Sequence, residues 1–262
     1  MQRRGADAFG IHRFERENLL CLGVAAPVTQ PSIRHISRTL YAALIQHLGD
    51  FHFHRIWNFI PEINREYGDL DTYKLFCLGR AEALEALQDT PLPAASAVGT
   101  PGEYLVIAAI AGSAKASPVE NPLQIPAYRY PERYGPRAPS FARATRIHGS
   151  ELYVSGTASI RQSESLHEGD VAAQFALALE NVDLVIRAAG LPESDNLIEH
   201  SRHHARRIYL RHPQDWKLLR HHPGTDPGEE QTLNVIQAEI CRPELLVEVE
   251  THIHARGEPA AE

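Results

Sequence analysis

The feature that most constrains the fold of this 262-residue chain is an order of predicted elements that occurs twice. Hydrophobic periodicity predicts the order β-β-α-β-α-β-β, and the same order returns roughly 135 to 140 residues later. Two repeats are too few for a solenoid. The pattern therefore predicts an α+β fold of two tandem domains, each a mixed sheet with helices on one face. One continuous sheet is the alternative, and it would require the connecting loop to cross that sheet.

The first copy is predicted over the N-terminal 111 residues. Ser32 is expected to cap a helix whose apolar face runs to residue 48 and which stops at Gly49, and Asp71 is expected to cap a second helix. The strands of this copy are predicted at 9–14, 19–25, 53–60, 95–99 and 104–111.

The second copy begins with a hairpin over 141–147 and 151–160 that turns at 148–150. Asp170 is expected to cap a long helix that ends at Gly190. A strand at 206–211 and a short helix at 214–220 follow, and strands at 232–240 and 245–253 close the chain.

The last strand of the second copy carries acidic residues that the first copy lacks. Its residues alternate, so Leu245, Val247 and Val249 share one face and Glu248 points to the other. If helices cover the apolar face, Glu248 points into whatever cleft the two domains form; a surface position is the alternative. Aligning the two last strands places Ile107 of the first copy opposite Glu248.

The stretch between the copies, residues 121–143, holds five prolines, three tyrosines and four arginines. No helix or central strand tolerates that proline density, so the stretch is predicted to be an extended, largely rigid loop. Tyrosine and arginine supply aromatic walls and planar forks that bind carboxylates. The loop therefore suits a small anionic substrate with a ring, although it could instead cover a sheet edge with its arginines in solvent.

Composition argues against several classes of function. A net charge of −7 disfavours a nucleic-acid or membrane-surface partner. No apolar run approaches the ~18 residues that span a bilayer, and the first ten residues lack the apolar stretch of a secretory signal. The three cysteines, Cys21, Cys77 and Cys241, are odd in number and far apart, which favours reduced thiols and a cytoplasmic location.

The 15 histidines do not form a recognisable metal-binding pattern. His52 and His54, like His252 and His254, would share a strand face, but no further ligands at a zinc-like spacing accompany them. The sequence therefore predicts no metal site.

Five motifs stand out along the chain: R-I-W-N-F-I-P-E-I-N at 55–64, F-C-L-G-R-A-E-A at 76–83, A-Y-R-Y-P-E-R-Y-G-P-R-A-P-S-F-A-R-A at 127–144, V-S-G-T-A-S at 154–159 and I-C-R-P-E-L-L-V-E-V-E at 240–250. The second copy resembles the RidA-like (YjgF-type) fold, and the longer motifs together resemble the chorismatases, which consist of two RidA-like domains. The resemblance implies a degenerate N-terminal domain at 1–115, a substrate loop at 116–140 and a catalytic domain at 141–262.

The chain also departs from the family pattern. Members usually carry a longer N-terminal segment, Leu123 stands where an arginine is common, and residues 161–163 replace a less charged stretch. These differences concern substrate affinity and stability more than the class of reaction.

Chorismatases release pyruvate from chorismate, a cyclohexadiene dicarboxylate with an enolpyruvyl ether, without a metal or organic cofactor. Protonation of the ether's methylene carbon requires a general acid, and a buried carboxyl serves if its pKa lies well above about 4.3. The resemblance implies Glu248 as that acid.

The resemblance also implies where the substrate is held. Arg137 and Arg143 are the candidates for binding its two carboxylates, with Tyr128 and Tyr134 as hydroxyl donors or ring walls. Either arginine could instead form a structural ion pair, with Glu132 or Glu151 as the partner. Arg80 is expected to be a charge on a helix surface, outside the site.

Two further positions concern the product. With glycine in the S-G-T-A-S motif and cysteine before the last strand, the chain resembles the branch of the chorismatases that forms 3-hydroxybenzoate. Diol-forming members carry alanine at both positions. Gly156 is then expected to leave room over the substrate ring, and Cys241 joins Glu248 in the catalytic set. Some 4-hydroxybenzoate is also possible. A monomer and a homotrimer are both compatible with the sequence.

Two other functions remain open at this point. One is a RidA-type imine or enamine deaminase, which relies on an arginine before the final strand; here the local sequence is Cys241-Arg242-Pro243, so that position is not cleanly kept. The other is a RidA-like protein that binds a small metabolite without catalysis.

Overall fold

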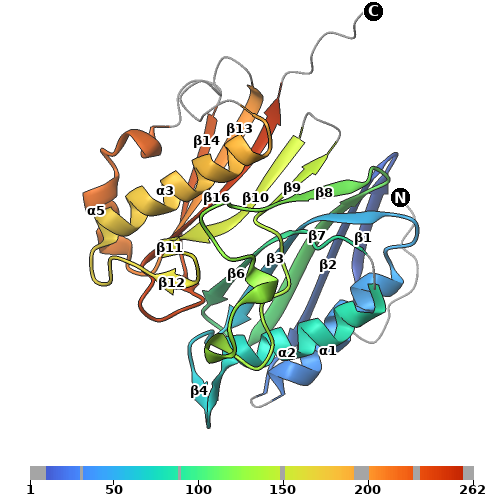
Figure 1. Cartoon of the computed structure of the whole chain (residues 1–262). Coiled ribbons are helices and arrows are strands. Elements are labelled where there is room, and N and C mark those ends of the chain that lie inside the picture. Colours follow the sequence, from blue (N-terminus) through green and yellow to red (C-terminus); the bar gives the residue numbers. More distant parts are fainter. Residues whose placement is uncertain are drawn as a thin grey trace, which may run out of the picture.

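The computed structural model describes residues 10–29, 32–87, 90–147, 151–191, 201–226 and 231–255. The described chain forms two six-stranded sheets, each with helices on one face (Figure 1). The predicted α+β class is therefore confirmed, and the alternative of one continuous sheet is wrong.

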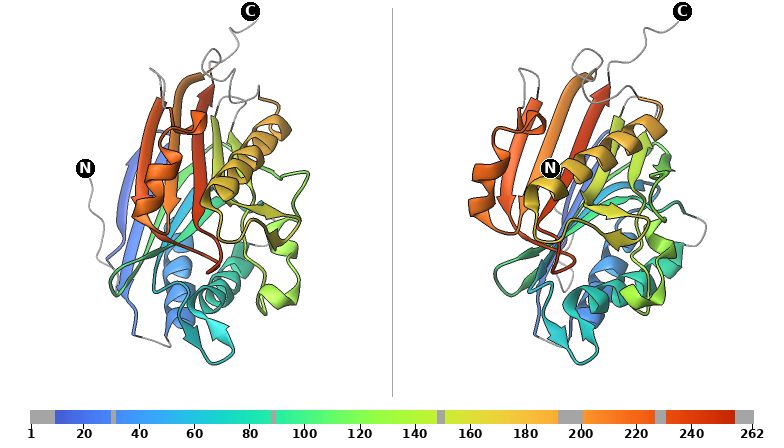
Figure 2. Two further views of the ribbon diagram at one scale, coloured as in Figure 1. Left: turned by 90° about the vertical axis from the view of Figure 1, so that its left-hand side faces the viewer. Right: turned by 60° about the vertical axis from the view of Figure 1, so that its left-hand side comes forward.

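The first sheet has the strand order β1-β2-β7-β3-β6-β15. Helices α1 and α2 pack side by side against one of its faces (Figure 2). Its elements are β1 (His12–Arg16), β2 (Leu19–Pro27), α1 (Ile33–Gln46), β3 (His52–Pro61), α2 (Thr72–Leu84), β6 (Ala94–Thr100), β7 (Tyr104–Gly112) and β15 (Glu239–Ile240).

The second sheet has the order β14-β13-β16-β10-β9-β8, and the long helix α3 lies across one of its faces. Its elements are β8 (Ala116–Val119), β9 (Ala144–Ile147), β10 (Glu151–Ala158), α3 (Val171–Ala188), β13 (Ser201–Leu210), α5 (Trp216–Leu219), β14 (Gln231–Gln237) and β16 (Val247–Ala255). Two small ribbons complete the strands: β4 (Glu66–Tyr67) with β5 (Leu70–Asp71), and β11 (Ile160–Arg161) with β12 (Glu164–Ser165).

The duplication predicted from the sequence is present in the topology. Strands β1-β2-β7-β3-β6 and strands β9-β10-β16-β13-β14 stand in the same spatial order. In each set every neighbouring pair is antiparallel except the last, β3 with β6 and β13 with β14, which is parallel. β8, from the segment between the copies, adds one strand to the edge of the second sheet.

The predicted helix caps are largely correct. The Asp71 carboxylate accepts the backbone N–H of Lys74 at 2.7 Å, and the Asp170 carboxylate accepts that of Ala173 at 2.9 Å. Ser32 precedes α1 as predicted, but its hydroxyl donates to the carbonyl of Thr29 and not to the helix. The hairpin turn expected at 148–150 lies outside the described residues.

The strand expected at 232–240 is divided between the two sheets. β14 pairs with β13 in the second sheet, whereas β15 pairs with β6 in the first through Glu239↔Gly99 and Ile240↔Val98. Ala238, at the crossing, is buried. The C-terminal half therefore completes the edge of the N-terminal sheet.

The alignment of the two last strands is wrong, because it pairs two residues that point to different faces of their sheets. Ile107 on β7 is buried in the core beneath α1 and α2, whereas Glu248 on β16 points away from α3. Because side chains alternate along a strand, equivalent residues of the two copies must share a face. A shift by one residue, which sets Val106 or Ala108 against Glu248, restores that correspondence.

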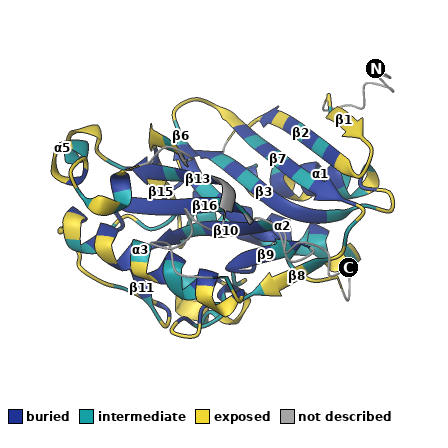
Figure 3. Ribbon diagram, turned by 90° about the horizontal axis from the view of Figure 1, so that it is seen from above, coloured by how far each residue is buried: buried dark blue, intermediate teal, exposed yellow. Residues whose placement is uncertain are grey.

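The faces of the two sheets that carry no helix pack against each other, and the central strands are the most buried part of the molecule (Figure 3). A small apolar cluster between the sheets joins Val98 of β6 to Tyr209 of β13 and Ile240 of β15. The Ser155 hydroxyl of β10 accepts the N–H of Ala95 in β6 at 2.9 Å. Polar and apolar contacts thus hold the two halves together.

The proline-rich stretch is a loop, as predicted, with two short 3-10 turns, η2 (Ala127–Arg129) and η3 (Glu132–Tyr134). Its start is held to the second half by hydrogen bonds between the backbones of residues 123–125 and Gln162. None of the helices in the described ranges combines the length and apolarity needed to cross a membrane.

Candidate active site

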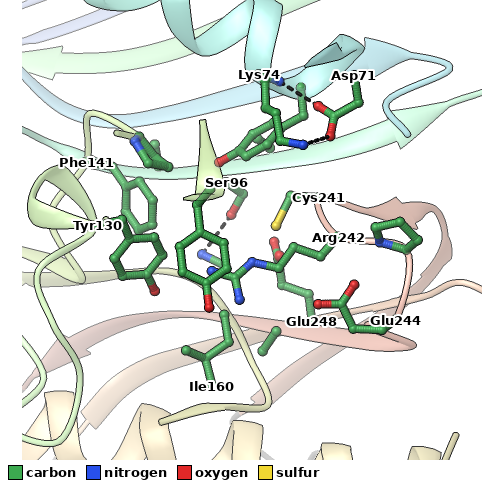
Figure 4. A pocket seen from close by; sticks show the side chains of 18 of the residues that line it. Asp71, Lys74, Ser96, Tyr130, Phe141, Ile160, Cys241, Arg242, Glu244 and Glu248 are labelled. Atoms are coloured by element: carbon green, nitrogen blue, oxygen red, sulfur yellow. Dashed lines mark hydrogen bonds and ion pairs between the residues drawn. The ribbon is translucent and has the colours of Figure 1, made fainter. Parts of the chain in front are cut away.

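A cavity of about 210 Å³ lies where α2, the proline-rich loop and the inner faces of the two sheets meet (Figure 4). Both halves of the chain contribute to its wall. The lining residues used below are Asp71, Lys74, Arg80, Ser96, Tyr130, Arg133, Tyr134, Phe141, Arg143, Gly156, Ala158, Cys241, Arg242, Glu244 and Glu248.

Glu248 reaches this cavity from β16, where its cross-strand neighbours are Ala158 and Tyr209. The residue is 4% exposed, and its Oε1 has no hydrogen-bond partner among the described residues. Burial and then the charge of Glu250 raise the pKa of Glu248 to about 8, although Arg55 and Arg143 act in the opposite direction. The carboxyl is therefore protonated at neutral pH and can donate a proton.

Gly156 sits directly against that carboxyl. A β-bulge interrupts the pairing of β10 with β16 between Val154 and Thr157, and it turns the Gly156 N–H toward the Ser96 hydroxyl at 2.9 Å. A Cβ at position 156 would lie 1.9 Å from Oε1 of Glu248 and 2.8 Å from Oγ of Ser96. In this structure the Glu248 carboxyl occupies the space that a side chain at position 156 would take. The glycine therefore makes room for Glu248, and not only for a substrate ring.

Arg143 is 3% exposed and lines the cavity from the end of the proline-rich loop. Its Nη2 donates to the Tyr130 hydroxyl at 2.6 Å, and its guanidinium lies 5.2 Å from the centre of the Phe141 ring. Its Nε has no partner in the described structure. A buried guanidinium with an unused donor is suited to a ligand carboxylate.

Arg80 also lines the cavity, so its expected place on a helix surface is wrong. It is 3% exposed, its guanidinium lies 5.2 Å from the Tyr41 ring centre, and no described residue accepts from its Nε or Nη2. The signal was present in the sequence, because Arg80 follows Phe76 by four and Cys77 by three positions and so shares their buried helix face.

Tyr134 lines the cavity as predicted, and Arg242 stacks on its ring at 4.0 Å from the centroid. Arg242 also donates to the carbonyl of Ser163 at 2.9 Å and to the Ser165 hydroxyl at 3.0 Å. It thereby links the proline-rich loop to the β11–β12 ribbon over the site. The sequence suggests Arg242 only as a candidate for imine deaminase chemistry, and no local pattern predicts its contact with Tyr134.

Two of the sequence-based candidates do not line the cavity. Arg137 is exposed and forms an ion pair with Glu85 at 2.8 Å, and Tyr128 is 41% exposed. The ion pair proposed as an alternative for Arg137 is therefore present, although with a partner on η1 (Glu85–Leu87) and not Glu132 or Glu151. The loop's 3-10 turns decide which of its tyrosines and arginines face inward.

Cys241 lies in the segment between β15 and β16, on the same side of the cavity as Glu248 (Figure 4). Burial, and then the negative charge that Glu248 carries above its own pKa, raise the pKa of the Cys241 thiol to about 12. The thiol is therefore neutral, which suits a steric or hydrogen-bonding role and not a nucleophilic one. Cys21, Cys77 and Cys241 are all free thiols.

The charge of the lining is mainly positive. Five lining residues are cationic: Lys74, Arg80, Arg133, Arg143 and Arg242. With Glu248 protonated, Asp71 and Glu244 are the anionic ones, and Asp71 is paired with Lys74 at 3.0 Å. Such a site favours a ligand that carries more than one negative charge.

The fold and this site define an α+β protein in which two related halves enclose a cationic cavity with a protonated glutamate. Residues 5–111 match the family described as "Chorismatase FkbO/Hyg5-like, N-terminal". A "3-hydroxybenzoate synthase" of Streptomyces hygroscopicus is 36% identical over 253 residues, which cover 89% of this chain and 73% of that protein. A "Chorismatase" of Streptomyces rapamycinicus is 38% identical, with 79% of this chain and 65% of that protein covered.

A solved crystal structure of a chorismatase superposes with a TM-score of 0.84 and 29% identity, over 95% of this chain and 78% of that one. The chain belongs to the chorismatase family and is an enzyme of that family, with the fold of the solved chorismatase. The resemblance found in the sequence is thereby confirmed.

Proposed function

We propose that the protein cleaves chorismate to pyruvate and a hydroxybenzoate, with Glu248 as the general acid. The observation that carries the proposal is the protonated Glu248 carboxyl, with Oε1 unpartnered among the described residues, on a cavity that also holds the unused donors of Arg80 and Arg143. The named activities of the relatives support the same conclusion.

The two buried arginines match the two carboxylates of chorismate. Each guanidinium is fixed by an aromatic neighbour, Tyr41 for Arg80 and Phe141 for Arg143, so little side-chain entropy is lost on binding. The rings of Tyr130 and Tyr134, 5.5 Å apart, pack against each other and form an aromatic wall of the same cavity, against which a cyclohexadiene ring can lie.

Glu248 then transfers its proton to the methylene carbon of the enolpyruvyl group, which leaves a cation at the ether carbon. Water adds to that carbon and returns a proton to the Glu248 carboxylate, and the resulting hemiketal breaks into pyruvate and a ring hydroxyl. This sequence consumes one water and gives a cyclohexadiene diol. Loss of one water from the ring gives hydroxybenzoate, so the balance is chorismate to pyruvate plus hydroxybenzoate.

We favour 3-hydroxybenzoate as the main product, with 4-hydroxybenzoate as a possible minor one. The support is the pair Gly156 and Cys241, which border Glu248 on the same cavity, and the name of the relative from Streptomyces hygroscopicus. No organic cofactor or metal enters the proposed steps. The three free thiols are compatible with the cytoplasmic location expected from the sequence.

The test is incubation of purified protein with chorismate. Pyruvate is followed with lactate dehydrogenase, and the ring product is separated by chromatography against 3-hydroxybenzoate, 4-hydroxybenzoate and diol standards. We expect equimolar pyruvate and 3-hydroxybenzoate. Pyruvate at the uncatalysed rate would overturn the proposed reaction, and the diol alone would overturn the proposed product.

A further inference from the structure

A second glutamate lies two residues from Glu248 on the same face of β16. Glu250 is 6% exposed, and four side chains donate to its carboxylate from both sheets. Its Oε2 accepts from Arg55 Nη2 at 2.5 Å and from Ser96 Oγ at 2.6 Å, and its Oε1 accepts from Trp57 Nε1 at 2.9 Å and from Arg207.

Glu248 and Glu250 are buried alike but hold opposite charge states. Burial alone would raise the pKa of Glu250, yet Arg55 and Arg207, with the bonds from Ser96 and Trp57, hold that pKa below its usual range. Glu250 is therefore a carboxylate while Glu248 is a neutral acid. Environments that raise the pKa of one carboxyl and lower the pKa of its neighbour give the two groups different roles in the chemistry of a site.

A hydrogen-bonded chain connects the two residues. The Ser96 hydroxyl donates to Glu250 and accepts the N–H of Gly156, and Gly156 in turn lies against the Glu248 carboxyl. The bulge of β10 and the inner edge of β6 are thus held in place by the Glu250 carboxylate.

We propose that Glu250 is a positioning residue for the general acid: its fixed negative charge keeps the Glu248 carboxyl protonated, and its bond to Ser96 holds Gly156 where that carboxyl packs. The inference rests on the proposed role of Glu248. The four hydrogen-bond donors around Glu250 then serve the protonation of Glu248, and not merely the contact between the two sheets.

The other charged groups near Glu248 act in the opposite direction or lie further along the cavity. Arg55 and Arg143 favour the ionised form of Glu248, and the Cys241 thiol and the Tyr209 phenol next to it are neutral. Removing the charge of Glu250 leaves Arg55 and Arg207 without their counter-ion, so Glu248 should ionise more readily. The remaining charged lining residues are Asp71, Lys74, Arg80, Arg133, Arg242 and Glu244.

Two substitutions should shift the pKa of Glu248 in opposite directions. Glu250→Gln keeps the volume but removes the negative charge. Arg207→Gln removes a positive charge at the outer end of the network, where the arginine side chain is 32% exposed and folding tolerates the change better. A purely structural role for Glu250 predicts no such opposition.

The measurement is the pH titration of the Glu248 carboxyl in the purified 262-residue protein, by infrared difference spectroscopy of the protonated C=O band with Glu248→Gln as the reference. We expect the midpoint to fall by about one pH unit or more in Glu250→Gln and to rise in Arg207→Gln. The alkaline limb of kcat/KM for chorismate should move in the same two directions, while circular dichroism at each pH reports that the variants are folded.

Midpoints that stay fixed, or that move in the same direction in both variants, overturn the inference. If Glu250→Gln does not fold, a fixed midpoint in Arg207→Gln is sufficient to overturn it. The spectroscopic readout needs no turnover. Opposite shifts without pyruvate release would therefore support the role of Glu250 and refute the proposed reaction, whereas turnover with fixed midpoints would do the reverse.

Discussion

Single side chains decide the chemistry of the cavity. Glu248 differs from the surface glutamates only in its surroundings: burial, a neighbouring carboxylate and an oxygen without a hydrogen-bond partner among the described residues. The buried guanidiniums of Arg80 and Arg143 differ from that of Arg137 in the same way. Residue type supplied the candidates, and environment separates those that face a substrate from those that face solvent.

Glu248→Gln should reduce pyruvate release by roughly 10²- to 10⁴-fold, because glutamine keeps the volume but cannot deliver a proton to carbon. Chorismate affinity, measured by calorimetry, should change little. A variant that turned over at a near wild-type rate would remove Glu248 from the catalytic role.

The same substitution should change how stability depends on pH. The folded pKa of Glu248 is raised from 4.5 to about 8, so the proton favours the folded state below pH 4.5, and this contribution is lost as pH rises through 8. Between those values the free energy of unfolding should fall with pH by at most about 1.4 kcal/mol per unit from this group. Urea unfolding of both proteins at pH 5.5 and 8.5 checks it: Glu248→Gln should gain stability relative to wild type at the higher pH, and equal differences at both pH values would contradict the assignment.

Arg80→Ala and Arg143→Ala should each weaken chorismate binding by roughly 1.5–3 kcal/mol, the cost of one charge-assisted carboxylate contact. Arg137→Ala is the matched control, since its guanidinium is paired with Glu85 at the surface. Titration calorimetry of the three variants decides the matter. A larger loss of chorismate affinity in Arg137→Ala than in the other two variants would contradict the assignment of Arg80 and Arg143, and not Arg137, to substrate binding.

At the scale of secondary-structure elements, irregularities rather than regular strands build the site. The bulge in β10 frees the Gly156 N–H for Ser96, the end of β14 leaves its sheet so that β15 can join the other, and η3 turns Tyr134 inward. Each irregularity moves a functional group from a ladder or from solvent to the cavity.

Gly156→Ala should displace the Glu248 carboxyl, because the new methyl group would meet Oε1 at 1.9 Å. We expect a reduced rate and a larger share of diol product, with a further shift toward the diol in the double variant with Cys241→Ala. Gly23→Ala is the control, since a Cβ there meets only His12 Cβ at 4.0 Å. Chromatography of the products reports the outcome, and an unchanged rate and product ratio in both Gly156 variants would contradict it.

At the scale of the whole molecule, the two halves form one structural unit. The sheets share the Glu250 network, the apolar cluster around Tyr209 and the pairing of β15 with β6. A cavity whose wall comes from both halves exists only when both are folded.

Unfolding should therefore be a single cooperative transition. The chain has two tryptophans, Trp57 at the contact between the sheets and Trp216 on α5 beside the second core. In Trp57→Phe the remaining Trp216 reports on the second core, and in Trp216→Phe the remaining Trp57 reports on the contact between the sheets. The fluorescence of the remaining tryptophan and the far-ultraviolet circular dichroism should give the same urea midpoint within each variant; separate midpoints would mean that the halves unfold independently.

The sequence by itself determined the duplicated order of strands and helices, the helix caps at Asp71 and Asp170 and the α+β class, because periodicity and capping are local properties. It also identified Glu248, Arg143, Tyr134, Gly156 and Cys241, all of which line the cavity. These residues lie in motifs long enough to carry a family resemblance. Their roles in substrate binding and catalysis remain predictions.

Only the tertiary structure decided which loop residues turn inward, that Arg80 is buried, and that Ile107 faces the helices while Glu248 faces the other sheet. It also decided that β15 crosses between the sheets and that Glu250 is held by donors from β3, β6 and β13. The physical reason is the same in each case. Burial, charge pairing and strand register depend on residues that are distant in sequence, as with Arg55 and Glu250, and no local pattern encodes which of them will meet.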